Sequence, residues 1–160
     1  MAETATARAA TAVSLENCKS MVGTTIGVSS WHLLSQSAIN LFADITSDMQ
    51  YIHVDELRAK DGPFGGTIVH GMLSLSMISA MFYEAVPVVE GASMSVNYGF
   101  DKVRFPSAVP VGSRVRARVA VGAAETARDG SMQVVWRVTI EREDGDKPAV
   151  VADWIVRLYA

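Results

Sequence analysis

Apolar residues recur at helical spacing in the first part of the chain and at every second position in the later part. After Ser35, a residue type favoured at helix N-caps, apolar side chains follow at intervals of one to three residues, as on one helix face. They are Ala38, Ile39, Phe42, Ala43 and Ile45. The pattern predicts a helix that ends near Ser47, with Asp48 on the loop beyond it. A short helical turn is predicted from Asp55 to Lys60, before the break at Asp61-Gly62-Pro63.

The segment from Val69 to Tyr83 is apolar almost throughout and carries no charged residue. Serines are its main polar side chains. A helix that is hydrophobic nearly all round is buried on most of its sides. We therefore expect this segment to be a central helix wrapped by a sheet.

The second half of the chain alternates between apolar and polar side chains, which is the period of a strand with one buried face. Strands are predicted at 93–105, 113–123, 132–141 and 150–159, with turns at 128–130 and 143–146. Helices followed by hairpin-linked strands indicate an α+β fold with an antiparallel sheet. Because one helix covers only one face of such a sheet, a dimer is expected to cover more of it.

Composition supports one globular domain. The 160 residues are 49% hydrophobic and 19% charged, which suits a single full core. We expect a loose tail over residues 1–15, which is rich in Ala and Thr, and a domain over 16–160. The start of the chain lacks the pattern of a signal peptide. Cys18 is the single cysteine, and no apolar run reaches the roughly 20 residues that span a bilayer. These features predict a cytoplasmic protein without a membrane partner.

The net charge of −3 and the pI near 5.6 argue against a nucleic-acid partner. Arg114, Arg116 and Arg118 alternate along one predicted strand and form a local basic stripe. Such a stripe is more often the solvated face of a sheet than a binding site for phosphates.

The stretch from Asp48 to Leu73 holds the strongest candidate chemistry. Asp48 and His53 are two titratable groups five residues apart, in a segment bounded by helix-breaking residues. Water addition to an α,β-unsaturated thioester needs a base, an acid and donors for the enolate oxygen. Asp48 and His53 can share the first two roles. The unpaired N–H groups at the start of the following helix, around His70 and Gly71, can supply the third.

Structural interpretations compete with this one. Asp48 can cap a turn after the first helix, and His53 can be a hydrogen-bonded core histidine. Asp48, His53, Asp55 and His70 can be imagined as metal ligands, but their spacing matches no common metal motif, so no metal is expected. Gly65-Gly66 lacks the flanking residues of a phosphate-binding loop. Spacing alone does not decide between a structural and a catalytic pair.

Two blocks of residues resemble the MaoC-like, (R)-specific enoyl-CoA hydratase family. Residues 48–55 read DMQYIHVD and residues 64–73 read FGGTIVHGML. The family motifs run roughly D-x-N-P-[IL]-H-x-D and F-G-x-x-I-x-H-G-M-L. Residues 97–117 resemble the nodulation protein N-like, single-domain branch, and the likeness extends from about Gly23 onward.

The resemblance implies a hotdog fold, in which an antiparallel sheet wraps a long central helix, and a homodimer that extends the sheet. It implies hydration of a trans-2-enoyl thioester of CoA or an acyl-carrier protein to the (R)-3-hydroxyacyl product, with no separate cofactor. Asp48 and His53 would be catalytic, and the Gly71 amide would form the oxyanion hole.

Further residues follow from the same resemblance. Gln50 and Tyr51 stand where the family usually has Asn and Pro. Gln50 is a candidate for orienting the pair or the substrate carbonyl, Tyr51 for forming part of the substrate wall, and His70 for binding or orienting the substrate. Ser76 matches a serine near the site in some hydratases, although a bond to a preceding backbone carbonyl is an equal alternative.

Two other functions are compatible with a hotdog fold. A hotdog thioesterase generally carries a carboxylate on the central helix, and the segment from Val69 to Phe82 has none. A non-catalytic subunit that binds acyl thioesters would not need the Asp48 and His53 pair. Both features favour the hydratase.

Overall fold

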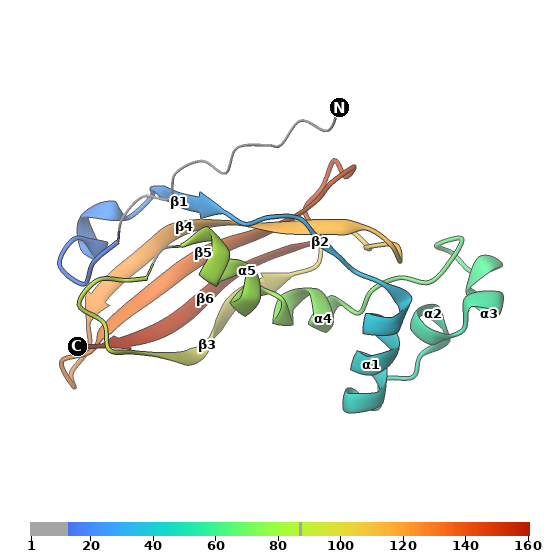
Figure 1. Cartoon of the computed structure of the whole chain (residues 1–160), viewed down its shortest axis with the longest axis horizontal. Helices are drawn as coiled ribbons and strands as arrows, with labels where there is room; N and C mark the ends of the chain where they lie inside the picture. The colour runs from blue at the N-terminus through green and yellow to red at the C-terminus, as the bar shows by residue number, and fades with distance from the viewer. Residues whose placement is uncertain (1–12, 87) are drawn as a thin grey trace.

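Four long antiparallel strands form most of a curved sheet, as the alternating sequence pattern predicts (Figure 1). The computed structural model describes residues 13–86 and 88–160 of the chain. The long strands are β3 (Met94–Arg104), β4 (Arg114–Thr126), β5 (Met132–Arg142) and β6 (Val150–Tyr159). Two short strands, β1 (Thr25–Val28) and β2 (His32–Leu33), pair with β4. The order β1-β4-β5-β6-β3 leaves β3 at one edge.

On β4, β5 and β6 the period-2 pattern separates a buried face from a more exposed one. On β4, four alternating side chains are fully buried: Val115, Ala117, Val119 and Val121. The arginines between them are partly exposed and pair with an acidic residue of the neighbouring strand. Arg116 and Arg118 each place Nε 2.8 Å from a carboxylate oxygen of Glu141 on β5. The basic stripe is therefore an ion-paired sheet face, consistent with the solvated interpretation.

The predicted central helix exists, but its bounds and continuity need correction. It is divided into α4 (Gly71–Ser76) and α5 (Ile78–Ala85). The chain stays right-handed at Met77, whose N–H donates to Leu73 O, so the two pieces follow one another directly. Val69 is not helical, because its N–H donates to Val109 O at 2.8 Å. The helical segment therefore begins two residues later than predicted and extends to Ala85.

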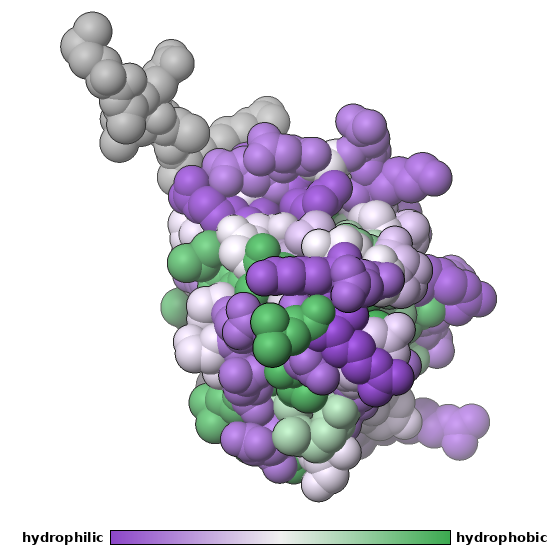
Figure 2. Space-filling model, turned by 90° about the vertical axis from the view of Figure 1, so that its right-hand side faces the viewer, coloured by the Kyte–Doolittle hydropathy of each residue, from purple (hydrophilic) through white to green (hydrophobic). Residues whose placement is uncertain are grey.

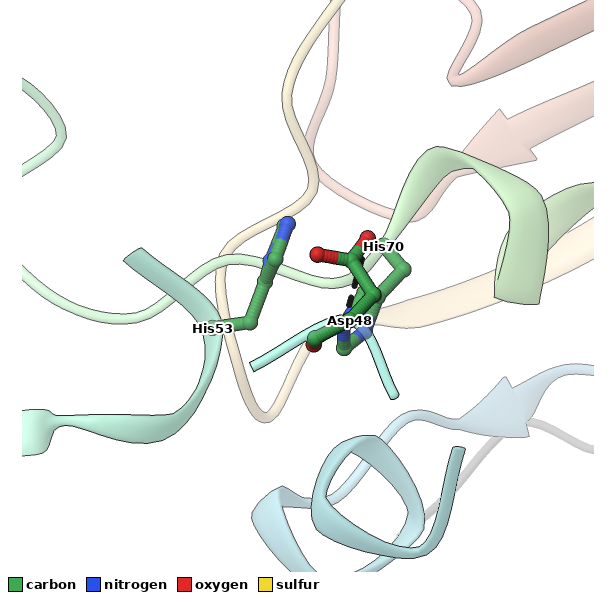
Figure 3. Close-up of side chains that lie close together, drawn as sticks. All are labelled: Asp48, His53 and His70. Carbon is green, nitrogen blue, oxygen red and sulfur yellow. Dashed lines mark hydrogen bonds and ion pairs between the residues drawn. The ribbon is translucent and has the colours of Figure 1, made fainter. Parts of the chain in front are cut away.

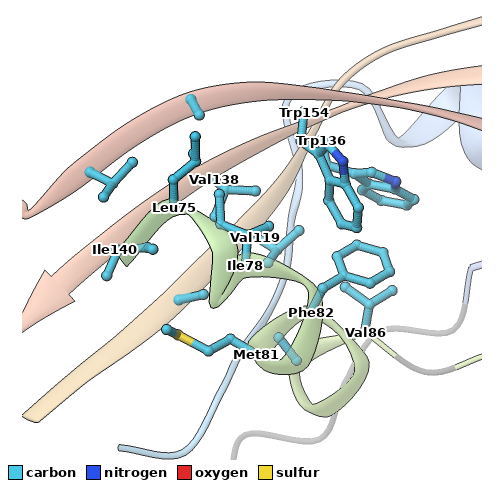
Figure 4. Packing of buried hydrophobic residues seen from close by; sticks show 14 of the residues in the cluster. Leu75, Ile78, Met81, Phe82, Val86, Val119, Trp136, Val138, Ile140 and Trp154 are labelled. Carbon is cyan, nitrogen blue, oxygen red and sulfur yellow. The ribbon is translucent and has the colours of Figure 1, made fainter. Parts of the chain in front are cut away.

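The core lies between α5 and the inner face of the sheet (Figure 4). Phe82 of α5 meets two tryptophans from neighbouring strands, with ring centroids 5.0 Å from Trp136 and 5.1 Å from Trp154. Ile78 and Met81 are also almost completely buried there. A helix enclosed by an antiparallel sheet is the hotdog arrangement, and the predicted α+β fold is confirmed.

Short helices form a lobe beyond one end of the sheet (Figure 1). They are α1 (Gln36–Thr46), α2 (Tyr51–Val54) and α3 (Glu56–Lys60). The hydroxyl of Ser35 accepts the Ala38 N–H, as expected of the N-cap, and α1 ends where Ser47 adopts φ 59°. This left-handed residue turns the chain and leaves Asp48 on the loop, as predicted.

The N-terminal region of the domain enters the core before the short helix η1 (Cys18–Met21). Residues 1–12 of the predicted tail lie outside the described residues. Val13 is buried, and the Leu15 N–H donates to Glu90 O at 3.0 Å, so packing starts within the range assigned to the tail. Among the residues that the structure describes, no helix has the length and apolar character needed to cross a membrane.

Candidate active site

Asp48, His53 and His70 come together where the loop after α1, helix α2 and the start of α4 meet (Figure 3). Each side chain offers a polar atom that lies within 4.8 Å of the others. The sequence indicated the first two as a pair and His70 as a separate orienting residue. The fold places all three in one cluster.

His53 is held by one ring nitrogen and leaves the other for chemistry. The residue is 7% exposed, and its Nδ1 lies 2.7 Å from Ile68 O. Because a carbonyl oxygen only accepts, Nδ1 must carry the hydrogen. In the neutral ring, Nε2 then has the free lone pair. His53 is thus a buried, hydrogen-bonded histidine whose Nε2 can still accept a proton.

The protein environment favours the neutral form of His53. Burial lowers the pKa of its imidazole below the ordinary value, and the nearby His70 acts in the same direction. The bond to Ile68 O and the attraction of Asp48 oppose this shift without reversing it. At neutral pH, His53 can therefore accept a proton at Nε2.

Asp48 presents an open carboxylate beside the histidines. Its side chain is 53% exposed, and Oδ2 lies 4.0 Å from His70 Nε2. Among the described residues Asp48 is not seen as a turn cap: Gln50 is the N-cap residue of α2, and Asp55 supplies the carboxylate that caps α3. An exposed carboxylate next to a buried imidazole can hold a water molecule between them.

The hydrogen bonds of the cluster bear on the alternative of metal ligation. His53 and His70 each direct one ring nitrogen at a backbone carbonyl, and the two rings are stacked, with centroids 3.8 Å apart and an interplanar angle of 24°. Asp55, the fourth candidate ligand, accepts the Arg58 N–H at 2.9 Å and is committed to α3.

Gly71 is the first residue of α4, as the oxyanion-hole hypothesis requires. The first N–H groups of a helix have no partner within the helix. A Cβ at this position would lie 3.0 Å from the ring of Phe105, which comes just after β3. The close approach of Phe105 therefore explains the glycine.

The remaining candidates occupy different surroundings. The Gln50 carbonyl accepts the His53 N–H at 2.9 Å, so this residue supports the turn that carries the imidazole. Tyr51 lies under the guanidinium of Arg58, at 4.0 Å from its ring centroid. Ser76 donates to Met72 O at 2.8 Å, which is the backbone bond considered as its alternative role. Their contacts with substrate remain predictions.

Gln36 is a supporting residue that the sequence did not reveal. Its amide nitrogen donates to His53 O at 2.8 Å, and its amide oxygen accepts the Thr67 hydroxyl at 2.6 Å. It thereby ties α1 to α2 and to the segment before α4. Phe42 and Phe105, which contact His70 and Gly71, were also missed. No local motif marks any of these residues.

The chain is similar to known proteins along most of its length. The chain is 44% identical over 144 residues to nodulation protein N of Rhizobium meliloti, covering 89% of each protein. It is 43% identical over 147 residues to 3-hydroxyacyl-thioester dehydratase Z of Mycobacterium tuberculosis, covering 92% of this chain and 97% of that one. The solved (R)-hydratase from A. caviae superposes with a TM-score of 0.69 at 27% identity, over 86% of this chain and 96% of that one.

A family model described as the MaoC like domain matches residues 17–143, which is most of the chain and includes the whole cluster. Together with relatives that match along nearly their full length, this shows that the chain belongs to the MaoC-like dehydratase family.

Proposed function

We propose that this protein is a hydratase that adds water to a trans-2-enoyl-CoA and gives the (R)-3-hydroxyacyl-CoA, and that it also catalyses the reverse dehydration. The observation that carries the proposal is the buried His53, with Nδ1 hydrogen-bonded to Ile68 O, grouped with the exposed carboxylate of Asp48. The names of two relatives, a 3-hydroxyacyl-thioester dehydratase and an (R)-hydratase, support the reaction class and the product configuration.

The proposed reaction moves one water molecule across the double bond. Asp48 orients the water, and His53 Nε2 takes one of its protons while the oxygen bonds to C3. Negative charge moves to the thioester oxygen, where the Gly71 N–H donates to it. The imidazolium of His53 then gives its proton to C2. The π bond is replaced by a C–O bond at C3 and a C–H bond at C2, with no net oxidation or reduction, so the reaction needs no cofactor beyond the CoA or acyl-carrier thioester of the substrate.

A thioesterase is the second candidate, and the helix argues against it. From Gly71 to Tyr83 no residue carries a carboxylate. Glu84, near the end of α5, accepts the Ser30 hydroxyl at 2.6 Å and lies 2.9 Å from His32 Nε2. It is therefore engaged with the loop around β2, at the end of the helical segment remote from Gly71.

The decisive experiment follows the enoyl absorbance of crotonyl-CoA with purified protein. We expect the absorbance to fall, and chiral analysis of the product to give the (R)-3-hydroxy isomer. Free CoA released from butyryl-CoA, without hydration of crotonyl-CoA, would support the thioesterase. Binding of both compounds without turnover of either would support a non-catalytic acyl-thioester subunit.

The pH dependence of kcat/KM should report the environment of His53. Its pKa lies below the ordinary value of 6.5 because burial disfavours the imidazolium. The neutral base therefore persists to lower pH than in a free histidine, and the acid limb should fall below about 6.5. Initial rates from pH 4.5 to 8 at low crotonyl-CoA would measure it. An acid limb clearly above that value would contradict His53 as the base.

We also propose a homodimer formed through β3. Within residues 13–86 and 88–160 this strand pairs with β6 alone, and it exposes four large apolar side chains: Met94, Val96, Tyr98 and Phe100. A long apolar edge strand is a template for pairing with another strand. A second copy of β3 would continue the sheet and cover these side chains.

If β3 forms the dimer interface, a single charged side chain introduced on this strand should weaken the dimer. Val96→Lys should shift the protein from dimer to monomer in light scattering at micromolar concentration, because it buries a lysine in the new interface. Val22→Lys is the matched control, since Val22 is an exposed valine on the loop after η1. A monomeric wild type, or equal behaviour of the two variants, would reject this interface.

A further inference from the structure

We propose that His70 is a positioning residue that holds Asp48 and His53 in register, and that it does not bind the substrate. The inference rests on the proposed hydration, because it assigns a role within that reaction. It differs from the orienting role toward substrate that the sequence suggested. Three contacts carry it: a hydrogen bond to the main chain of Asp48, a stack on His53, and a tilted contact with Phe42.

The first contact fixes the loop that carries the carboxylate. His70 Nε2 lies 3.0 Å from Asp48 O, and the carbonyl must accept, so Nε2 carries the hydrogen. Asp48 follows the left-handed Ser47 at the end of α1, and its own side chain is half-exposed. The bond from His70 therefore ties an otherwise open loop to the start of α4 (Figure 3).

The second contact restricts the imidazole of His53. The two rings are nearly parallel at 3.8 Å, and Phe42 packs on His70 with ring centroids 5.1 Å apart. His53 is thus confined by the His70 ring and by its Nδ1 bond to Ile68 O. The two restraints act through the ring face and Nδ1 of His53. Its Nε2 therefore remains available to accept the proton of the water molecule.

His70 itself is poorly placed to touch a substrate. Its side chain is 2% exposed, compared with 53% for Asp48. Its Nδ1 is buried, and within the described part of the chain no partner for it is found. The only donor of the neutral ring is already directed at Asp48 O. What remains for His70 is to act through the two groups that it contacts.

Two substitutions separate the hydrogen bond from the stack. His70→Phe keeps an aromatic ring between Phe42 and His53 but removes the donor. His70→Gln keeps an N–H near the position of Nε2 but removes the ring. With crotonyl-CoA, His70→Phe should lower kcat about 10- to 100-fold, as a misplaced catalytic group does, with KM changed less than about twofold. His70→Gln should recover most of this loss.

A double-mutant cycle distinguishes positioning from general damage. If His70 acts by placing Asp48, adding His70→Phe to Asp48→Asn should lower kcat by less than about twofold further. An equal loss in both backgrounds would overturn the proposal, as would a raised KM at unchanged kcat. Ser74→Ala is the control, because Ser74 is a buried residue one turn along α4 whose hydroxyl also lacks a partner among the described residues. It should keep the wild-type kcat.

A measurement without substrate separates this proposal from the proposed function. Nitrogen-15 NMR of the histidine rings should show His70 protonated at Nε2 and His53 at Nδ1. A His70 ring protonated at Nδ1 alone would overturn the positioning contact even in an active enzyme. Conversely, a wild-type protein with the expected tautomers that hydrates no enoyl-CoA would reject the hydratase and leave the contact to Asp48 established.

Discussion

Asp48→Asn and His53→Gln are each expected to lower kcat for crotonyl-CoA hydration by about 10²- to 10⁴-fold, the usual loss on removing a general acid or base. Asparagine cannot hold the water with a charged oxygen or stabilise the imidazolium. Glutamine cannot accept a proton at the position of Nε2. Steady-state kinetics at saturating substrate would measure both losses, and unfolding curves would show whether each variant is folded.

Matched variants elsewhere in the chain test whether these losses belong to the site. Asp55→Asn makes the same chemical change at the cap of α3, where asparagine also caps well. His32→Gln does so beside Glu84, near the end of α5 remote from Gly71. Both should keep kcat within about a few-fold of wild type, since neither group transfers the proton. Hydration by Asp48→Asn or His53→Gln at the wild-type rate would disprove the mechanism.

Trp136→Ala should cost about 3–5 kcal/mol in the free energy of unfolding, the range for removing a large aromatic side chain from a core. Trp136 is fully buried at the centre of β5 and packs against Phe82 of α5. Its loss leaves a cavity between the sheet and the central helix. Urea unfolding would measure the change, and it is a large part of the stability of an ordinary domain.

Trp136→Phe is the control for this substitution. The Nε1 of Trp136 is buried and has no hydrogen-bond partner within the described residues, so the loss of this N–H in phenylalanine leaves no acceptor unpaired. We expect it to cost clearly less than Trp136→Ala. If the two variants unfold at the same urea concentration, packing of this ring does not stabilise the junction of helix and sheet.

Much of the fold follows from local pattern. The alternation of β4 and β5 marks which side chains are buried because a strand turns successive side chains to opposite faces. The position of α1 followed from Ser35 and the apolar spacing after it. The central helix was predicted less well, because the pairing of Val69 with Val109, which delays its start, depends on the surrounding fold and not on composition.

Only part of the candidate active site could be predicted from the local sequence pattern. Asp48, His53 and Gly71 belong to a short ordered motif, so their proximity could be proposed from sequence. Gln36 could not, because its bond to His53 O joins residues 17 positions apart on two separate helices. Phe105 gave no signal either, since its contact with Gly71 arises only when β3 ends beside α4.

By itself, the sequence determined the strands, the buried helix and the order of the acid, the imidazole and the glycine, because these depend on spacing along the chain. The tertiary structure decided how they work together. It directed His53 Nδ1 to Ile68 O and His70 Nε2 to Asp48 O, across 15 and 22 residues. Such contacts exist only once the lobe packs against the start of α4, which no local pattern encodes.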